Sequence, residues 1–224
     1  MIKENKYWYL RNHKLFEQLE SKDIESLCII SNLKNGRKND FIFFTEEEVK
    51  KIYFLKVGTV KICREDSAGK EIITEILTQG DIFGFTGEGT ARLEYAKVIS
   101  DEARLCFFEY TNFKNVLKEN PLLSLNYSAA IQDKLLLFQQ KYEDLIFKDV
   151  ETRVKDFFNR YAKHHGKEKK EGVEMEMLLT HQDIADYTAS SRQSVTKIIN
   201  KLVEDGKLIY EGRKKVIIPS EIIL

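Results

Sequence analysis

The sequence changes its hydrophobic period at Pro121, and this change constrains the fold more than any other feature. Between Pro121 and Gly166 the chain has neither glycine nor a further proline, so nothing there breaks a helix. Apolar residues recur at steps of four, three, four and three, the spacing of a seam between paired helices, and the flanking residues are polar. We predict a long dimerisation helix over residues 121–149, with a helix buried in a monomer as the alternative. The seam residues are Ile131, Leu135, Phe138, Tyr142 and Leu145.

Upstream of this helix, short β segments alternate with turns from residue 41 to residue 108. Residues 52–57 are rich in β-branched and aromatic side chains, and residues 59–63 alternate apolar with polar. Short, regularly spaced strands are typical of an antiparallel barrel or sandwich. We therefore predict a β-barrel domain over residues 1–120.

Residues 178–219 carry the pattern of a helix-turn-helix followed by a β hairpin. Thr180 and Asp183 have capping-box spacing, and Ser191 is a suitable N-cap for a second helix. That second helix combines an apolar stripe with a face that has no acidic residue between Ser190 and Val203. We predict that the hairpin after it forms a basic wing.

A polar helix face of this kind suits contact with DNA. Arg192 and Gln193, in the first turn, can contact guanine and adenine edges in a major groove. Hydroxyl and ammonium groups nearby would bind phosphates and fix the register. We therefore predict a winged helix-turn-helix domain over residues 150–224 with double-stranded DNA as its partner; a small packing module with a solvated basic face is the alternative. The predicted DNA contacts are Ser191, Arg192, Gln193, Ser194, Thr196, Lys197, Asn200, Lys201, Arg213, Lys214 and Lys215.

Taken together, these segments resemble the Crp/Fnr family of transcription regulators. The resemblance rests on residues 52–60, on 80–84, on 147–150 with Arg153, and on 179–209. It implies an α+β fold: an N-terminal antiparallel β jelly-roll sensor, a long dimerisation helix and a C-terminal winged helix-turn-helix. It also implies a cytoplasmic homodimer that binds a palindromic operator and, if it is an activator, contacts RNA polymerase.

The sensor half departs from the cyclic-nucleotide-binding members of that family. Those members hold the ribose with a Gly-Glu pair and the cyclic phosphate with Arg-Ser, whereas this chain has Gly84-Phe85 and Glu94-Tyr95. A carboxylate would repel the phosphate. We therefore expect no response to cyclic AMP and an unidentified small effector; Arg92 leaves a rearranged phosphate clamp as the alternative. The effector-site candidates are Gly84, Phe85, Thr86, Arg92, Glu94, Tyr95, Phe138 and Gln139.

Composition limits the remaining function classes. The 36 Lys and Arg balance the 36 Asp and Glu, so we expect weak binding to DNA away from specific sites. The three cysteines lack metal-ligand spacing, and we predict no metal and no cofactor; Cys63 and Cys106 stay open as thiol or haem contacts. The chain lacks a P-loop, a zinc-protease motif and a nucleophile elbow, which argues against an enzyme. No apolar run reaches membrane-spanning length.

Three further expectations concern local structure and overall role. The charged segment 166–172 is expected to be a solvated loop. A hinge near Asp149 would pass a signal from the sensor to the DNA-binding domain. The rival function is a ligand-binding or storage module whose helix-turn-helix contacts other proteins.

Overall fold

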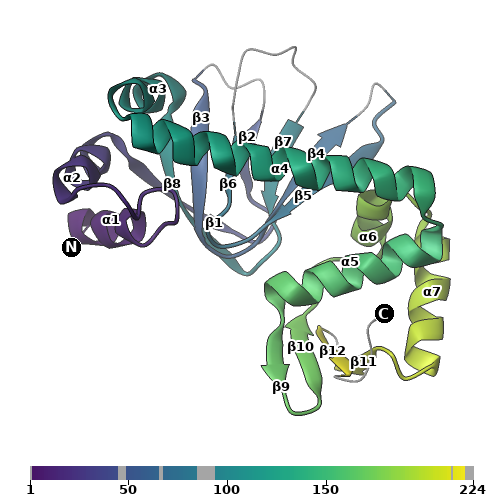
Figure 1. Ribbon diagram of the computed structural model, residues 1–224. Helices are drawn as coiled ribbons and strands as arrows, with labels where there is room; N and C mark the ends of the chain where they lie inside the picture. Colours follow the sequence, from purple (N-terminus) through teal and green to yellow (C-terminus); the bar gives the residue numbers. More distant parts are fainter. Residues whose placement is uncertain (1, 45–48, 66–67, 85–93, 213, 220–224) are drawn as a thin grey trace. The chain divides into compact units, whose positions relative to one another are not determined.

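A computed structural model describes residues 2–44, 49–65, 68–84, 94–212 and 214–219 (Figure 1). The chain divides into two compact units, one made of residues 1–70 and 74–138 and the other of residues 71–73 and 139–224. The first unit is rich in β structure, whereas the second combines helices with a small sheet. The fold is therefore α+β, as the sequence predicts.

The N-terminal unit contains two four-stranded sheets, with strand orders β1-β8-β3-β6 and β2-β7-β4-β5. The pairs β1–β8, β3–β8, β3–β6, β2–β7 and β4–β7 run antiparallel. The inner faces of the two sheets supply a core that includes Tyr53, Leu55, Val60, Ile62 and Phe83. This arrangement confirms the antiparallel jelly-roll prediction. The strands are β1 (Asn32–Arg37), β2 (Phe41–Phe44), β3 (Lys51–Val57), β4 (Val60–Glu65), β5 (Glu71–Leu77), β6 (Ile82–Gly84), β7 (Glu94–Val98) and β8 (Glu102–Glu109).

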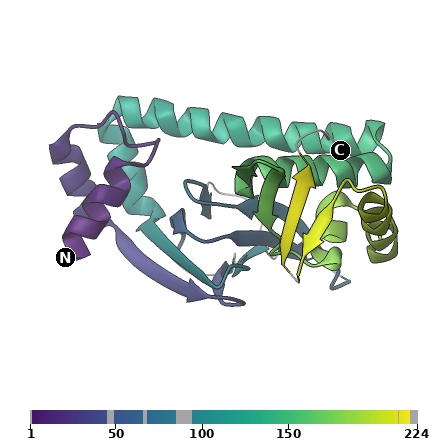
Figure 2. The same ribbon diagram turned by 90° about the horizontal axis from the view of Figure 1, so that it is seen from below.

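Three helices that the sequence analysis did not predict complete this unit: α1 (Ile2–Arg11), α2 (Ser21–Ile30) and α3 (Tyr110–Glu119). Figures 1 and 2 show α1 and α2 side by side at the N-terminus. Phe16, between them, is fully buried, and its ring centroid lies 5.3 Å from that of Phe54 on β3. Because one core cluster contains residues of α2, β3 and β8, the N-terminal helices form part of the β domain's interior.

The long helix predicted after Pro121 is present as α4 (Pro121–Phe147). Four of the five predicted seam residues are exposed, and Ile131 is half-buried. Large apolar side chains at this level of exposure are unusual on a soluble monomer when they line one helix. The exposed fractions are 55% for Leu135, 64% for Phe138, 62% for Tyr142 and 48% for Leu145.

In the second unit, α4 is followed along the chain by α5 (Val150–His165), β9 (Lys167–Lys169) and β10 (Gly172–Glu176). Helices α6 (His181–Thr188) and α7 (Arg192–Glu204) follow, and then β11 (Ile209–Glu211) and β12 (Lys215–Pro219). The four strands form an antiparallel sheet in the order β11-β12-β10-β9. Figure 2 shows β11 and β12, in yellow, as the hairpin that the sequence predicts after the second helix.

The expectation of a loop at 166–172 is wrong, because this segment belongs to the β9–β10 hairpin. Gly172 permits the hairpin by its backbone conformation, with a φ of 143°, and by its lack of a side chain. A Cβ there would lie 2.0 Å from the backbone oxygen of Ile218 on β12. The charge run contains a short strand, β9, and the start of β10, whose other edge pairs with β12 far along the chain.

Candidate nucleic-acid interface and effector site

The two helices of the predicted helix-turn-helix begin at the caps that the sequence indicates. The hydroxyl of Thr180 accepts from the Asp183 N–H at 3.1 Å, and the Asp183 carboxylate accepts from the Thr180 N–H at 2.8 Å. Ser191 caps α7 by accepting from the Ser194 N–H at 3.0 Å. Between the helices, Ala189 adopts the left-handed conformation with a φ of 49°. These caps fix where α6 ends and where α7 starts.

Helix α7 has a buried face and a polar face. Val195, Ile199 and Leu202 are at most 2% exposed and pack α7 onto its unit. Most of the predicted base and phosphate contacts lie on the opposite side, since burying the apolar stripe turns the intervening positions outward. The exposed members are Ser191, Arg192, Gln193, Lys197, Asn200 and Lys201, while Ser194 and Thr196 are half-buried.

The hydroxyl groups predicted to bind phosphate all have partners within the protein. The Ser191 and Ser194 hydroxyls lie 2.9 Å apart. The hydroxyl oxygen of Thr196 lies 2.9 Å from Nδ1 of His181 and donates to the Arg192 backbone oxygen at 2.9 Å. Burial and the charge of Arg192 both lower the pKa of His181, so this ring is neutral in the interaction. The sequence analysis did not identify His181 as part of this surface.

Three of the predicted lysine contacts form ion pairs inside their own unit. Lys201 lies 3.3 Å from Glu151, and Lys214 lies 3.5 Å from Glu176. Lys215 is held by two carboxylates, one from β10 and one from β11. Arg213 lies outside the described residues.

Arg153 joins α5 to the turn between α6 and α7. Its guanidinium donates to the backbone oxygens of Lys148 at 2.6 Å, Thr188 at 2.9 Å and Ala189 at 3.2 Å. In the sequence, Arg153 was identified only as part of the family resemblance, together with residues 147–150, and no structural role was predicted for it. These bonds connect the end of α4 directly to the turn that orients α7.

A second connection joins α4 to α5. The carboxylate of Asp144, a residue only 7% exposed, lies 2.7 Å from Lys148 and 2.9 Å from Arg160. Burial raises the pKa of Asp144, but the hydrogen bonds from Lys148 and Arg160 outweigh it and lower the pKa overall. The carboxylate therefore stays ionised. The Asp149 side chain caps α5 through Thr152, and the hinge near Asp149 stays a prediction.

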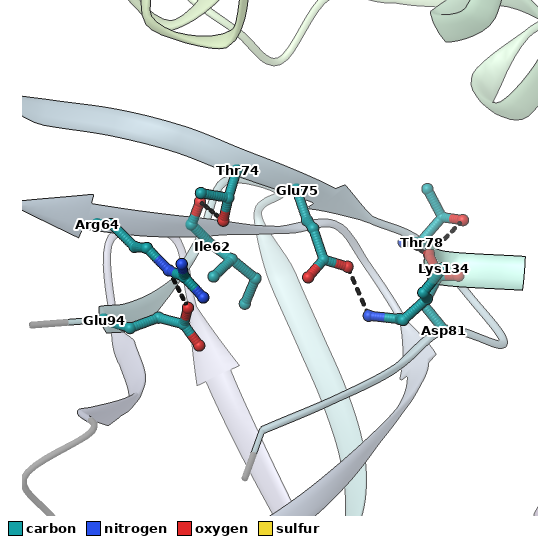
Figure 3. A network of polar contacts seen from close by, with 8 residues as sticks. All are labelled: Ile62, Arg64, Thr74, Glu75, Thr78, Asp81, Glu94 and Lys134. Atoms are coloured by element: carbon teal, nitrogen blue, oxygen red, sulfur yellow. Dashed lines mark hydrogen bonds and ion pairs between the residues drawn. The ribbon is translucent and has the colours of Figure 1, made fainter. Parts of the chain in front are cut away.

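On the β4–β5–β7 side of the barrel, Glu94, a candidate effector-site residue, belongs to a group of polar contacts (Figure 3). Glu94 lies 2.6 Å from Arg64, and Glu75 lies 2.5 Å from Lys134 of α4. Burial raises the pKa of Asp81, whose carboxylate accepts from the Thr78 N–H at 2.6 Å. Each anionic group in Figure 3 is thus already engaged.

The other effector-site candidates are spread over several elements. Tyr95 on β7 packs its ring against Phe41, with 5.4 Å between centroids. Gly84 ends β6 with a φ of 106°, and a Cβ there would lie 2.5 Å from the Lys51 backbone oxygen. Phe138 and Gln139 are exposed on α4. Phe85, Thr86 and Arg92 lie outside the described residues.

The two cysteines left open as thiol or haem contacts both lie on strands of the barrel, Cys63 on β4 and Cys106 on β8. Cys63 and Cys106 are fully buried, and burial raises the pKa of Cys106 to about 11. A thiol of this kind is not ionised at neutral pH and reacts slowly. No cluster of three His, Cys, Asp or Glu side chains capable of holding a metal occurs in the described ranges, and no helix there has the length and apolar character of a membrane span.

Comparison with known proteins identifies both halves of the chain. Residues 33–120 match the cyclic nucleotide-binding domain family, and residues 152–221 match the Crp-like helix-turn-helix domain family. A global nitrogen regulator from Nostoc is 29% identical over 84% of this chain and 85% of its own length. The cAMP-activated global transcriptional regulator CRP from Pasteurella multocida is 29% identical over 77% of this chain and 82% of its own.

A solved structure shares the fold. FixK2 from Bradyrhizobium japonicum superposes with a TM-score of 0.75 at 18% identity, covering 84% of this chain and 92% of that one. The sensor-type domain, the long helix and the Crp-like helix-turn-helix occur here in one chain and in that order. The chain belongs to the Crp/Fnr family of DNA-binding transcription regulators.

Proposed function

We propose that this regulator binds a palindromic operator as a homodimer, with α7 of each protomer in the major groove of one half-site. The half-sites would lie about 34 Å apart, one turn of B-DNA. The observation that carries the proposal is the exposed, acid-free face of α7, which begins at a capped N-terminus. In this proposal Arg192 and Gln193 contact bases, and residues 150–224 form the DNA-binding domain.

Selection of bound sequences from random DNA tests this proposal. We expect a palindrome to emerge, and Arg192→Ala to weaken its binding by about 1–3 kcal/mol and to relax the preference at one base pair per half-site. Arg104→Ala is the matched control, because Arg104 is an exposed arginine on β8 of the other unit. An Arg192→Ala protein with unchanged affinity and preference would contradict the assignment.

The proposed homodimer is formed by the seam on α4. The homodimer is supported by the row of exposed apolar residues on α4. In a monomer these residues would stay in contact with water, and burying them in a dimer interface gains about 25 cal/mol per Å² of apolar surface. We expect Leu135→Asp to produce monomers in sedimentation velocity. Gln140→Asp adds the same charge on the side of the helix away from the seam and should leave a dimer. A wild-type protein that sediments as a monomer would contradict the proposal.

We further propose that the sensor, residues 1–120 with the adjoining helix 121–149, does not respond to cyclic AMP. The support is Glu94, whose carboxylate stands where cyclic-nucleotide-binding relatives use Arg-Ser and is engaged by Arg64. Calorimetric titration with cyclic AMP should give no saturable heat and no rise in melting temperature. Saturable binding would refute this part alone. In this proposal the sensor responds instead to an unidentified small effector. The protein acts in the cytoplasm, and RNA polymerase is a further partner if the protein activates transcription.

A further inference from the structure

The lysine Lys215 at the start of β12 is held between two acidic strands. Its Nζ lies 2.7 Å from Glu174 of β10 and 2.9 Å from Glu211 of β11. Register explains the second contact, because Glu211 is the Cα partner of Lys215. On the other side Lys215 pairs with Glu176, and Glu174 lies two residues along the same face of β10. The sheet therefore places one ammonium group between two carboxylates.

The cations at the start of α7 are in a different situation. Within the described ranges, neither Arg192 nor Lys197 forms an ion pair with a carboxylate, and both side chains are exposed. These two cations on the exposed face of α7 are thus available to DNA, whereas Lys215 is already neutralised. Glu174 shows the effect of this pairing, since the hydrogen bond from Lys215 lowers the pKa of its carboxyl.

This pairing changes what Lys215 can contribute to DNA binding. A free lysine gains affinity at a phosphate because it displaces condensed counterions from the DNA. Lys215 would first have to leave two carboxylates, and these would then face the phosphate without a counter-charge. The repulsion between carboxylate and phosphate opposes the gain.

We propose that Glu174 and Glu211 limit the affinity of the protein for the DNA backbone by holding Lys215 in an internal ion-pair cluster. The effect lowers binding to DNA of every sequence by a similar factor and leaves base contacts at α7 untouched, so discrimination between sequences stays with α7. The equal numbers of basic and acidic residues, 36 each, agree with this role. The inference rests on the proposed function, because it requires that the wing approaches DNA.

The test compares a Glu174→Gln/Glu211→Gln double variant with wild type. Binding to a random-sequence duplex and to the selected operator is measured by fluorescence anisotropy over a series of KCl concentrations. We expect tighter binding to both duplexes by a similar factor, and a log K against log salt slope that is steeper by about 0.9.

The matched control is Glu168→Gln/Glu204→Gln, which removes two negative charges from the same unit. Among the residues that the structure describes, neither carboxylate forms an ion pair with a lysine. It reports the change that net charge alone produces. If the two double variants have the same slope, the proposal is overturned.

A third substitution separates Lys215 from its surroundings. Lys215→Gln should change the salt slope little in the wild-type background and reduce it by about 0.9 in the Glu174→Gln/Glu211→Gln background. Equal effects in both backgrounds would overturn the proposal. A wild-type protein that binds no DNA would instead contradict the proposed function, so the two failures are distinguishable.

Discussion

The Nδ1 atom of His181 lies 2.9 Å from the hydroxyl oxygen of Thr196, and this contact ties the first residue of α6 to the second turn of α7. The same hydroxyl donates to the Arg192 backbone oxygen. Thr196 therefore connects the two helices that must move together if α7 is to enter a groove as a rigid body. The sequence predicts that Thr196 binds phosphate, whereas in the fold its hydroxyl forms hydrogen bonds within the protein.

Replacing Thr196 with Val should remove that bond while keeping the shape of the side chain. We expect operator binding to weaken by about 1 kcal/mol, roughly fivefold, with an unchanged salt slope because threonine and valine are both uncharged. Thr196→Ser keeps the hydroxyl and should bind like wild type. Anisotropy titrations at several salt concentrations measure both quantities. A Thr196→Val protein that binds the operator like wild type would contradict this role for the hydroxyl.

The helix-turn-helix could be predicted in detail because its signals are local. Capping residues, an apolar stripe and a left-handed turn position act within a few residues of one another, and the structure contains both predicted caps. The α4 seam was visible for the same reason, since its period is a property of one helix.

The features that sequence analysis missed depend on distant parts of the chain. Phe16 lies in a segment without clear periodicity, and its role follows only from packing against Phe54 and Phe108. The hairpin that contains the strand at 167–169 is held in a sheet because β10 pairs on its other edge with β12, far along the chain. The ion pair between Glu94 and Arg64 joins residues on two strands, and no spacing rule predicts it. Contacts of this kind are set by tertiary structure, which overrides local preference.

The N-terminal helical segment should be essential to the stability of the sensor unit. Phe16→Ala removes a fully buried ring from the core between α1 and α2, and we expect it to lower the free energy of unfolding by about 3–5 kcal/mol. Urea unfolding followed by circular dichroism measures the change. Phe41→Ala is the matched control, because that ring is 46% exposed. A loss below about 1 kcal/mol for Phe16→Ala would show that the segment is dispensable.

His13 should make the stability of the same unit depend on pH. Burial lowers its pKa to about 4, although the hydrogen bond to the Gly80 oxygen at 3.0 Å opposes the shift. Between pH 6.5 and 4 the unfolded chain therefore takes up a proton that the folded chain does not, and stability falls as the pH falls. The loss should reach about 3 kcal/mol and stop near pH 4.

His13→Gln isolates this contribution. The pKa of His165 is also lowered to about 4 by burial, so wild type alone would not separate the two rings. The difference in unfolding free energy between wild type and His13→Gln should shrink as the pH falls from 7 to 4. A difference that is constant over this range would contradict the assignment of a neutral, buried His13.

Arg153 should couple the stability of the second unit to its DNA binding. Its guanidinium satisfies three backbone oxygens, two of which belong to the turn between α6 and α7. Arg153→Lys presents one ammonium group in place of a planar fork and can serve only part of this set. We expect it to lower the free energy of unfolding by about 1–3 kcal/mol and to weaken operator binding, because the start of α7 loses its fixed position.

The matched control for this substitution is Arg160→Lys on the same helix. Arg160 bonds the carboxylate of Asp144 through a single nitrogen, which a lysine can replace, and among the described residues it makes no hydrogen bond to the α6–α7 turn. Thermal unfolding and operator titration of both variants should show a larger loss for Arg153→Lys in each measurement. If Arg153→Lys loses stability but keeps operator affinity, the guanidinium holds the fold together without orienting α7.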